Sequence, residues 1–71
     1  MSNPTIHIGQ LIRDELRRQN HSVTWLAAQL GCARSTVYTL FRRNTIDTDL
    51  LLRLSLVLNH DFFAEYSKRL K

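Results

Sequence analysis

The chain has 71 residues, with ten lysines and arginines against six aspartates and glutamates, so its formal net charge is +4. Hydrophobic residues make up 44% of the chain and charged residues 23%, which is typical of a folded domain and excludes a disordered tail. This length predicts one small domain spanning residues 1–71, and it leaves little room for a catalytic cavity beside the core.

Membrane-spanning and disulfide-linked classes of protein are also excluded. The longest unbroken apolar run has four residues, Trp25 to Ala28, which is too short to cross a bilayer. The stretch from Met1 to Ile8 has no basic start and no long apolar segment, so we expect no signal peptide. The single cysteine, Cys32, excludes an intrachain disulfide and predicts a cytoplasmic protein.

The apolar residues follow helical spacing along the whole chain, and no window alternates for long enough to indicate a strand. The first helix is expected from about Ile6 to Gln19, with Thr5 or His7 as its N-cap. The predicted fold class is therefore all-α, with about five helices.

Two short helices are predicted next. Ser22 or Thr24 can cap the second helix, since either hydroxyl can accept from the free amides of a first helical turn. Gly31 is expected to end that helix after Leu30, because glycine adopts the left-handed conformation at little steric cost. The third helix is predicted from Arg34 to about Arg42.

The last two helices follow a short loop. Asp47 stands at the expected N-cap of a fourth helix that runs to Leu58, and Asn59 can end that helix in the left-handed conformation. Asp61 is expected to cap a short fifth helix. That helix would carry the apolar residues Phe62, Phe63, Tyr66 and Leu70.

Positive charge is segregated along the chain. No acidic residue occurs between Glu15 and Asp47, whereas this gap contains Arg17, Arg18, Arg34, Arg42 and Arg43. Such segregation indicates either a nucleic-acid footprint or a solvated face, and charge alone does not decide between them. For Arg17 and Arg18 we expect a solvent-facing position, with phosphate contact as the alternative.

Residues 23–42, VTWLAAQLGCARSTVYTLFR, hold the most specific pattern in the chain. Two short helices meet at a tight turn, and Ala27 supplies a small side chain where they cross most closely. The apolar residues around it are spaced to face one shared core: Leu26, Leu30, Cys32, Val37 and Leu40.

The third helix keeps a polar face once its core residues are set aside. Arg34, Tyr38 and Arg42 are four residues apart and form one ridge, and Ser35 and Thr39 lie beside it. This face is cationic and free of acids, which is the chemistry that a helix needs to enter the major groove of DNA.

The stretch resembles a helix-turn-helix, with Ala27 and Gly31 at its small positions. The chain from Ile8 to Tyr66 is similar to the phage-repressor/Cro type, the XRE-like family of five-helix DNA-binding domains. Three segments carry the resemblance: LAAQLG before the turn, ARSTVYTLF after it, and DTDLLLRLSLVLN in the fourth helix. The resemblance implies a sequence-specific transcriptional regulator, similar to a repressor.

The resemblance also implies which residues meet DNA. Arg34 and Ser35 would read bases near the start of the recognition helix, and Tyr38 and Thr39 would reach bases or the backbone. Phosphate contacts would come from Arg42, Arg43 and Asn44. An arginine can read guanine through a bidentate contact, whereas contacts to phosphate carry no sequence information.

Three positions depart from the family pattern. Val23 replaces the usual glutamine that opens the second helix, and Ala33 replaces the usual serine before the third. Trp25 stands where the family is commonly polar. These departures favour an alternative function, a helical protein-interaction or antitoxin-type module that keeps the fold and has weakened DNA readout.

The fourth helix has more leucines than one core face needs. Leu51, Leu54 and Leu58 are expected in the core, whereas Leu52 and Leu56 fall toward the opposite side. The latter pair predicts either a self-association strip or burial under the C-terminal segment. The other candidates for a homodimer interface are Phe62, Phe63 and Tyr66.

No pattern in the sequence indicates an enzyme, a metal site or a cofactor. His7, His21 and His60 are far apart and lack paired ligand spacing. Gly-rich phosphate loops, nucleophile elbows and paired carboxylates do not occur. The expected partners are double-stranded DNA and a second copy of the chain, without a small-molecule ligand.

Overall fold

The computed structural model describes residues 6–70, and within them the chain forms five α-helices and no strand. The elements are α1 (Ile8–Arg18), α2 (Val23–Leu30), α3 (Arg34–Phe41), α4 (Thr48–Leu58), α5 (Phe63–Ser67) and a 3₁₀ turn, η1 (Lys68–Leu70). The all-α, five-helix architecture expected from the sequence is confirmed.

Side-chain hydrogen bonds set the start of α2 and of α4. The hydroxyl of Ser22 accepts from the amide of Trp25 at 3.0 Å, so Ser22 and not Thr24 is the cap of α2. The carboxylate of Asp47 accepts from the amide of Leu50 at 2.8 Å and caps α4 as predicted.

Left-handed residues end the same two helices. Gly31 has a φ of 70° after α2, and Asn59 has a φ of 50° after α4, both as expected. The first helix is shorter than predicted because His7 caps it, its Nδ1 accepting from the amide of Gln10 at 3.2 Å. The other candidate cap, Thr5, lies outside the described residues.

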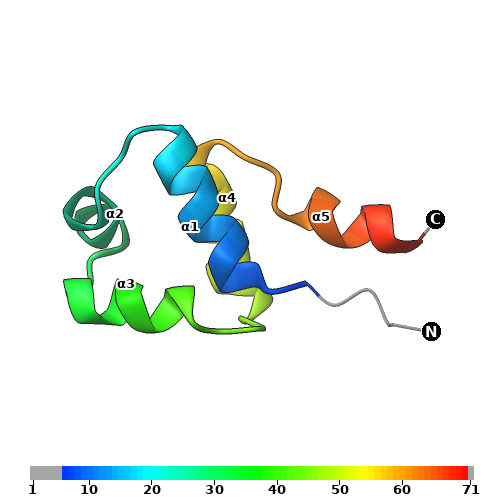
Figure 1. Cartoon of the computed structure of the whole chain (residues 1–71), viewed down its shortest axis with the longest axis horizontal. Coiled ribbons are helices and arrows are strands. Elements are labelled where there is room, and N and C mark those ends of the chain that lie inside the picture. The colour runs from blue at the N-terminus through cyan, green and yellow to red at the C-terminus, as the bar shows by residue number, and fades with distance from the viewer. Residues whose placement is uncertain (1–5, 71) are drawn as a thin grey trace.

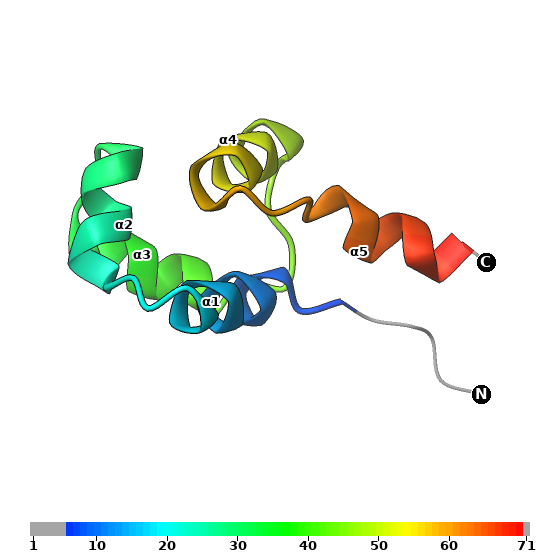
Figure 2. The same cartoon turned by 90° about the horizontal axis from the view of Figure 1, so that it is seen from above.

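The helices are spread along the 39 Å long axis of the molecule. Figures 1 and 2 show α2 and α3 together at one end, α1 and α4 in the middle, and α5 leading away at the other end. The third and fifth helices are therefore presented at opposite ends of the fold.

One continuous apolar core joins α1, α2, α3 and α4, and Phe62, which directly precedes α5, also belongs to it. Its buried members are Ile8, Ile12, Leu16, Leu26, Ala27, Val37, Leu40, Leu51, Leu54, Leu58 and Phe62. The three leucines expected in the core from the fourth helix are among them. Leu30, Cys32 and Phe41 are only half-buried and pack against the edge of this core.

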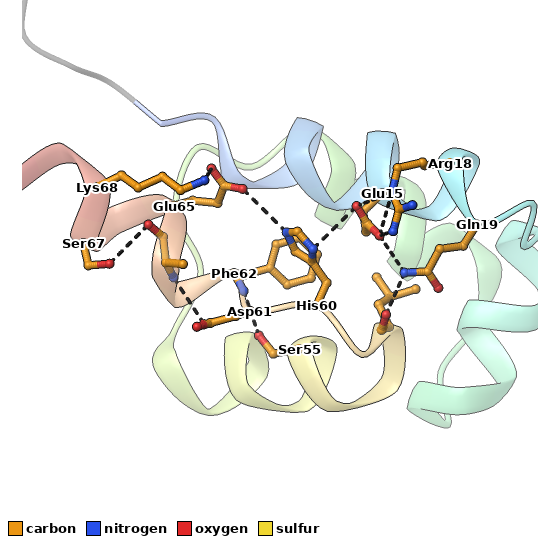
Figure 3. A network of polar contacts seen from close by, with 12 residues as sticks. Glu15, Arg18, Gln19, Ser55, His60, Asp61, Phe62, Glu65, Ser67 and Lys68 are labelled. Atoms are coloured by element: carbon orange, nitrogen blue, oxygen red, sulfur yellow. Dashed lines mark hydrogen bonds and ion pairs between the residues drawn. The ribbon is translucent and has the colours of Figure 1, made fainter.

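A buried carboxylate links α1 to the end of α4 (Figure 3). Glu15 accepts from the Nε of Arg18 at 3.0 Å and from the side-chain amide of Gln19 at 2.6 Å. The same amide of Gln19 donates to the carbonyl oxygen of Leu58 at 2.6 Å. Glu15 is therefore fully satisfied, and the Arg18 hydrogen bond, with smaller help from Gln19 and His60, lowers the pKa of its carboxyl from 4.5 to about 2 against the opposing effect of burial.

Few polar contacts hold the fifth helix to the body of the molecule. His60 bridges two acids, with its Nδ1 3.7 Å from Glu15 and its Nε2 3.5 Å from Glu65 on α5 (Figure 3). The carboxylate of Asp61 accepts from the amide of Ala64 at 3.2 Å, the cap contact expected from the sequence. No residue of α5 itself is buried.

Phe62 requires a correction. The sequence placed it among candidates for an exposed dimer surface, but its side chain is fully buried in the core of the single chain. Its ring packs edge-on against His60 with 4.7 Å between the centroids, and its amide donates to the hydroxyl of Ser55 at 3.3 Å. Leu70, expected on the fifth helix, lies in η1 and is exposed.

Candidate nucleic-acid interface

A tight turn over residues 31–33 connects α2 to α3. Gly31 adopts the left-handed conformation there, and the amide of Cys32 donates to the carbonyl oxygen of Ala27 at 3.0 Å. Ala27 and Val37 are both buried where the two helices pack. This packing turns the opposite face of α3 outward.

The outward face of α3 carries all four residues predicted to meet bases. Arg34, Ser35, Tyr38 and Thr39 are exposed, and Tyr38 has 55% of its surface accessible. The hydroxyl of Thr39 donates to the carbonyl oxygen of Ser35 at 3.0 Å, which is a contact within the helix. The polar ridge expected from four-residue spacing is therefore present and uncovered in the single chain.

The loop after α3 is anchored to α1 by its backbone. The carbonyl oxygen of Asn44 accepts from the amide of Ile8 at 3.3 Å, and the side-chain Nε of Arg43 donates to the carbonyl oxygen of Thr45 at 3.2 Å. The side chains of Arg42, Arg43 and Asn44 are exposed. The predicted phosphate contacts therefore lie at one end of the outward face of α3, on a loop of defined conformation.

The arginines of this face keep their charge uncompensated. Within residues 6–70, none of the ion pairs involves Arg34, Arg42 or Arg43. Acids pair instead with cations of α1 and of the C-terminal segment. An uncompensated cationic face attracts the phosphate backbone of nucleic acids.

The three residues that depart from the family pattern have different surroundings in the structure. The indole of Trp25 stacks on the ring of His21 with 3.6 Å between centroids and 7° between planes. Val23 is half-buried and packs against the core. Ala33 precedes α3 without a side-chain hydrogen bond, so the first turn of that helix lacks a side-chain cap.

A second group of cationic side chains lies beside α3. The sequence pattern did not identify these side chains as one site. Arg13, Arg17 and His21 line a groove together with Tyr38 and Arg42. These residues belong to α1, α3 and two flanking segments, so only the packing of the helices brings them together. The acid-free stretch of sequence signalled Arg17 but not Arg13.

The exposed helix seated on a partner helix across a glycine turn is a helix-turn-helix, and the family comparison agrees. A family model of the bacteriophage CI repressor helix-turn-helix domain matches residues 19–62, which span α2, α3 and α4 and more than half of the chain. The chain belongs to this family. Comparisons with curated proteins and with solved structures found no match.

Membership of the CI repressor helix-turn-helix family supports a DNA-binding regulator in general terms. It also confirms the resemblance to phage repressors seen in the sequence.

This CI-repressor-type domain also exposes four apolar side chains of α4 and α5, away from the ridge of α3. Leu52 and Leu56 have 50% and 72% of their surface accessible, so the C-terminal segment does not bury them. Phe63 and Tyr66 on α5 are exposed as well. The four side chains remain candidates for an interface between copies, whereas Phe62 is inside the core.

Neither a metal-binding cluster nor a membrane-spanning helix occurs within residues 6–70. No group of three or more His, Cys, Asp or Glu side chains is arranged to hold a metal ion. None of the helices over the same residues has the length and apolarity needed to cross a membrane.

Proposed function

We propose that the chain is a sequence-specific transcriptional regulator of the cytoplasm that binds double-stranded DNA with α3 in the major groove. The exposed, acid-free face of α3 is the observation that supports this most directly. A helix is about 10–12 Å wide with its side chains, and the major groove of B-DNA is about 12 Å wide. Because α2 packs only on the inner side of α3, the outer side is free to enter the groove.

Arg34 and Ser35 stand in the first turn of α3 and are the proposed base readers. Tyr38 and Thr39 lie one turn further along the same face and would reach bases or the sugar-phosphate backbone. Arginine offers a planar fork of donors that matches the two acceptors on the major-groove edge of guanine. This gives Arg34 the largest expected share of sequence discrimination.

Arg42, Arg43 and Asn44 are the proposed backbone contacts. They lie at the end of α3, where the loop is tied to α1 by backbone hydrogen bonds. A cation held at a fixed place beside the groove neutralises a phosphate and sets the register of the helix without reading bases. Their contribution to binding would fall steeply with salt.

We further propose a symmetric homodimer that forms through the apolar strip of Leu52, Leu56, Phe63 and Tyr66. One helix-turn-helix covers few base pairs, and symmetric dimers place two recognition helices about 34–36 Å apart, one turn of DNA. Because the strip lies on the faces of α4 and α5 away from the core, pairing through it would leave the outward face of α3 uncovered. Regulation would then be steric, by occupancy of an operator.

The alternative is a protein-interaction or antitoxin-type module. The exposed Leu52 and Leu56 favour it, since an apolar strip also fits a different protein chain. In that case charge reversal at Arg34 or Arg42 would leave function unchanged. The uncovered cationic ridge favours DNA over this alternative.

Unbiased selection of duplexes bound by the purified protein tests the proposal, and we expect a palindromic consensus. Arg34→Ala should then lower discrimination at one base pair of each half-site by about 1–3 kcal/mol. Arg42→Ala should weaken binding to all duplexes alike and lower the salt slope by about one. The matched control is Arg69→Ala, which removes the same charge from η1 at the far end of the molecule. Failure to bind any duplex at low salt would overturn the proposal.

A further inference from the structure

A groove of about 570 Å³ opens beside the recognition helix. Its walls come from the second half of α1, the start of α2 and the end of α3. The lining residues are Arg13, Leu16, Arg17, His21, Val23, Tyr38, Phe41 and Arg42. Two of them, Tyr38 and Arg42, also belong to the proposed DNA-facing ridge.

The charge of the groove is of one sign. Arg13, Arg17 and Arg42 contribute three guanidinium groups to its walls, and none of the described residues that line it is acidic. Arg17 and Arg42 are exposed and take part in no ion pair within residues 6–70. Three guanidinium groups around one groove repel one another, and an anion bound among them would relieve that repulsion.

The guanidinium group of Arg13 has a donor that makes no hydrogen bond within the fold. Its Nε is shielded from solvent and makes no hydrogen bond to any described residue. The nearest acid is Asp14, whose Oδ1 lies 4.0 Å from that nitrogen and whose side chain is largely exposed. The Arg13 side chain as a whole is 39% exposed, so the other donors of its guanidinium group can reach an acceptor oxygen in the groove.

The shape and the floor of the groove define what it can hold. A volume of this order falls in the range of about 300–1,000 Å³ that is typical of sites for organic ligands, and a bare ion would fill little of it. Leu16, Val23 and Phe41 supply apolar surface between the cations, and Tyr38 adds a ring and a hydroxyl. The walls therefore suit an anionic group together with the carbon framework attached to it.

We propose that this groove is a phosphate-binding site that takes one phosphate with its attached sugar, and that Arg17 and Arg13 on α1 are its principal donors. The phosphate has two sources with the same chemistry. It can belong to the DNA backbone beside the helix in the major groove, in which case the inference rests on the proposed function. It can also belong to a free nucleotide, which would compete with DNA for Tyr38 and Arg42.

The first arm of the test uses adenosine monophosphate and inorganic phosphate as probes, without DNA. Amide chemical-shift changes should cluster at the groove residues, and the nucleotide should bind more tightly than inorganic phosphate because of the apolar floor. Arg17→Ala should weaken nucleotide binding about tenfold, the loss expected for one charge-assisted hydrogen bond. Arg17→Lys should restore part of the affinity, whereas Arg69→Ala should leave it unchanged.

The second arm measures DNA binding across a salt series with the same variants. If the groove holds a backbone phosphate, Arg17→Ala should lower the slope of log K against log salt by about 0.9 with the preferred sequence unchanged. Because the side chain of Arg17 makes no hydrogen bond or ion pair within the described residues, its substitution should leave the thermal unfolding of the protein unaltered. Arg13→Gln is a second variant with the same expectation for both arms.

The two arms separate the outcomes. A response of the second arm alone assigns the site to the DNA backbone, and a response of the first arm alone assigns it to a free nucleotide. If neither arm responds to Arg17→Ala and Arg13→Gln, the site does not exist. If the unaltered protein binds no DNA at any salt concentration, the proposed function fails, and the first arm alone decides whether the groove binds phosphate.

Discussion

The backbone amide of Gly9 donates a hydrogen bond to the carbonyl oxygen of Arg43 at 3.0 Å. This bond seats the first turn of α1 directly on the end of α3 and the loop behind it. A Cβ at Gly9 would lie 2.5 Å from the carbonyl oxygen of Phe41 and 2.6 Å from its carbonyl carbon. Glycine is required here by the close approach of two backbones, and the contact fixes where α3 ends relative to the core.

Gly9→Ala should therefore destabilise the domain by about 1–3 kcal/mol, because rigid backbone stands where the methyl group would go. Gly31→Ala is the matched comparison, since a Cβ there meets nothing within 4 Å and carries only the strain of a left-handed φ of 70°. That strain should cost about 1 kcal/mol. Urea denaturation followed by circular dichroism measures both, and a Gly9→Ala protein no less stable than wild type would contradict the tight approach.

The neighbours Phe62 and Phe63 should lose very different amounts of stability when each is truncated. Phe62→Ala removes a fully buried ring from the core and should lower the free energy of unfolding by about 3–5 kcal/mol. Phe63 has 38% of its surface exposed, so Phe63→Ala should cost much less. Equal losses of stability in thermal unfolding of the two variants would show that the register of the α4–α5 connection is different.

Glu15 should make stability depend on acid pH. Its folded pKa of about 2 lies below the ordinary 4.5, so the folded state binds fewer protons than the unfolded state between these values. The contribution is present above about pH 4.5 and is lost as the pH falls toward 2. Because Arg18 is largely exposed and solvent screens the pair, we expect a loss on the order of 1–2 kcal/mol.

Urea titrations at successive pH values check this expectation. Glu15→Gln lacks the ionisable group and should lose less stability than wild type between pH 4.5 and 2. Asp14→Asn alters the adjacent, exposed acid and should keep the profile of the wild type. Parallel profiles for wild type and Glu15→Gln would mean that the buried network does not hold in solution.

Leu56→Glu should abolish self-association if copies pair through the strip on α4 and α5. Leu56 is the most exposed leucine of α4, so a carboxylate there should leave the fold intact and place two like charges at a symmetric contact. Sedimentation equilibrium of wild type, Leu56→Glu and Gln29→Glu measures the effect. Gln29→Glu adds the same charge to an exposed site on α2 and should remain dimeric. A dimeric Leu56→Glu protein would place the interface elsewhere.

The sequence by itself determined the helices and the polar face of the third one. The cap at Asp47 and the left-handed residues Gly31 and Asn59 act through hydrogen bonds and backbone preferences within a few residues, so local sequence was sufficient. Between Ser22 and Thr24 as the cap of α2, the choice was made only by the structure. The ridge of α3 follows from helical spacing once the core positions are known. These local features make up the helix-turn-helix, and the structure and the family match confirm that motif.

Only the tertiary structure decided which of the remaining side chains are buried and which meet. The neighbours Phe62 and Phe63 are the same residue type, and the path of the chain after α4 turns one inward and leaves the other outside. The groove brings Arg13 and Arg17 beside Arg42 because α1 packs against α3. Contacts between segments far apart in sequence depend on how helices cross, and helical periodicity in a single sequence does not specify those crossings. Part of the positive charge of the chain therefore lies on one surface that α1 and α3 form together.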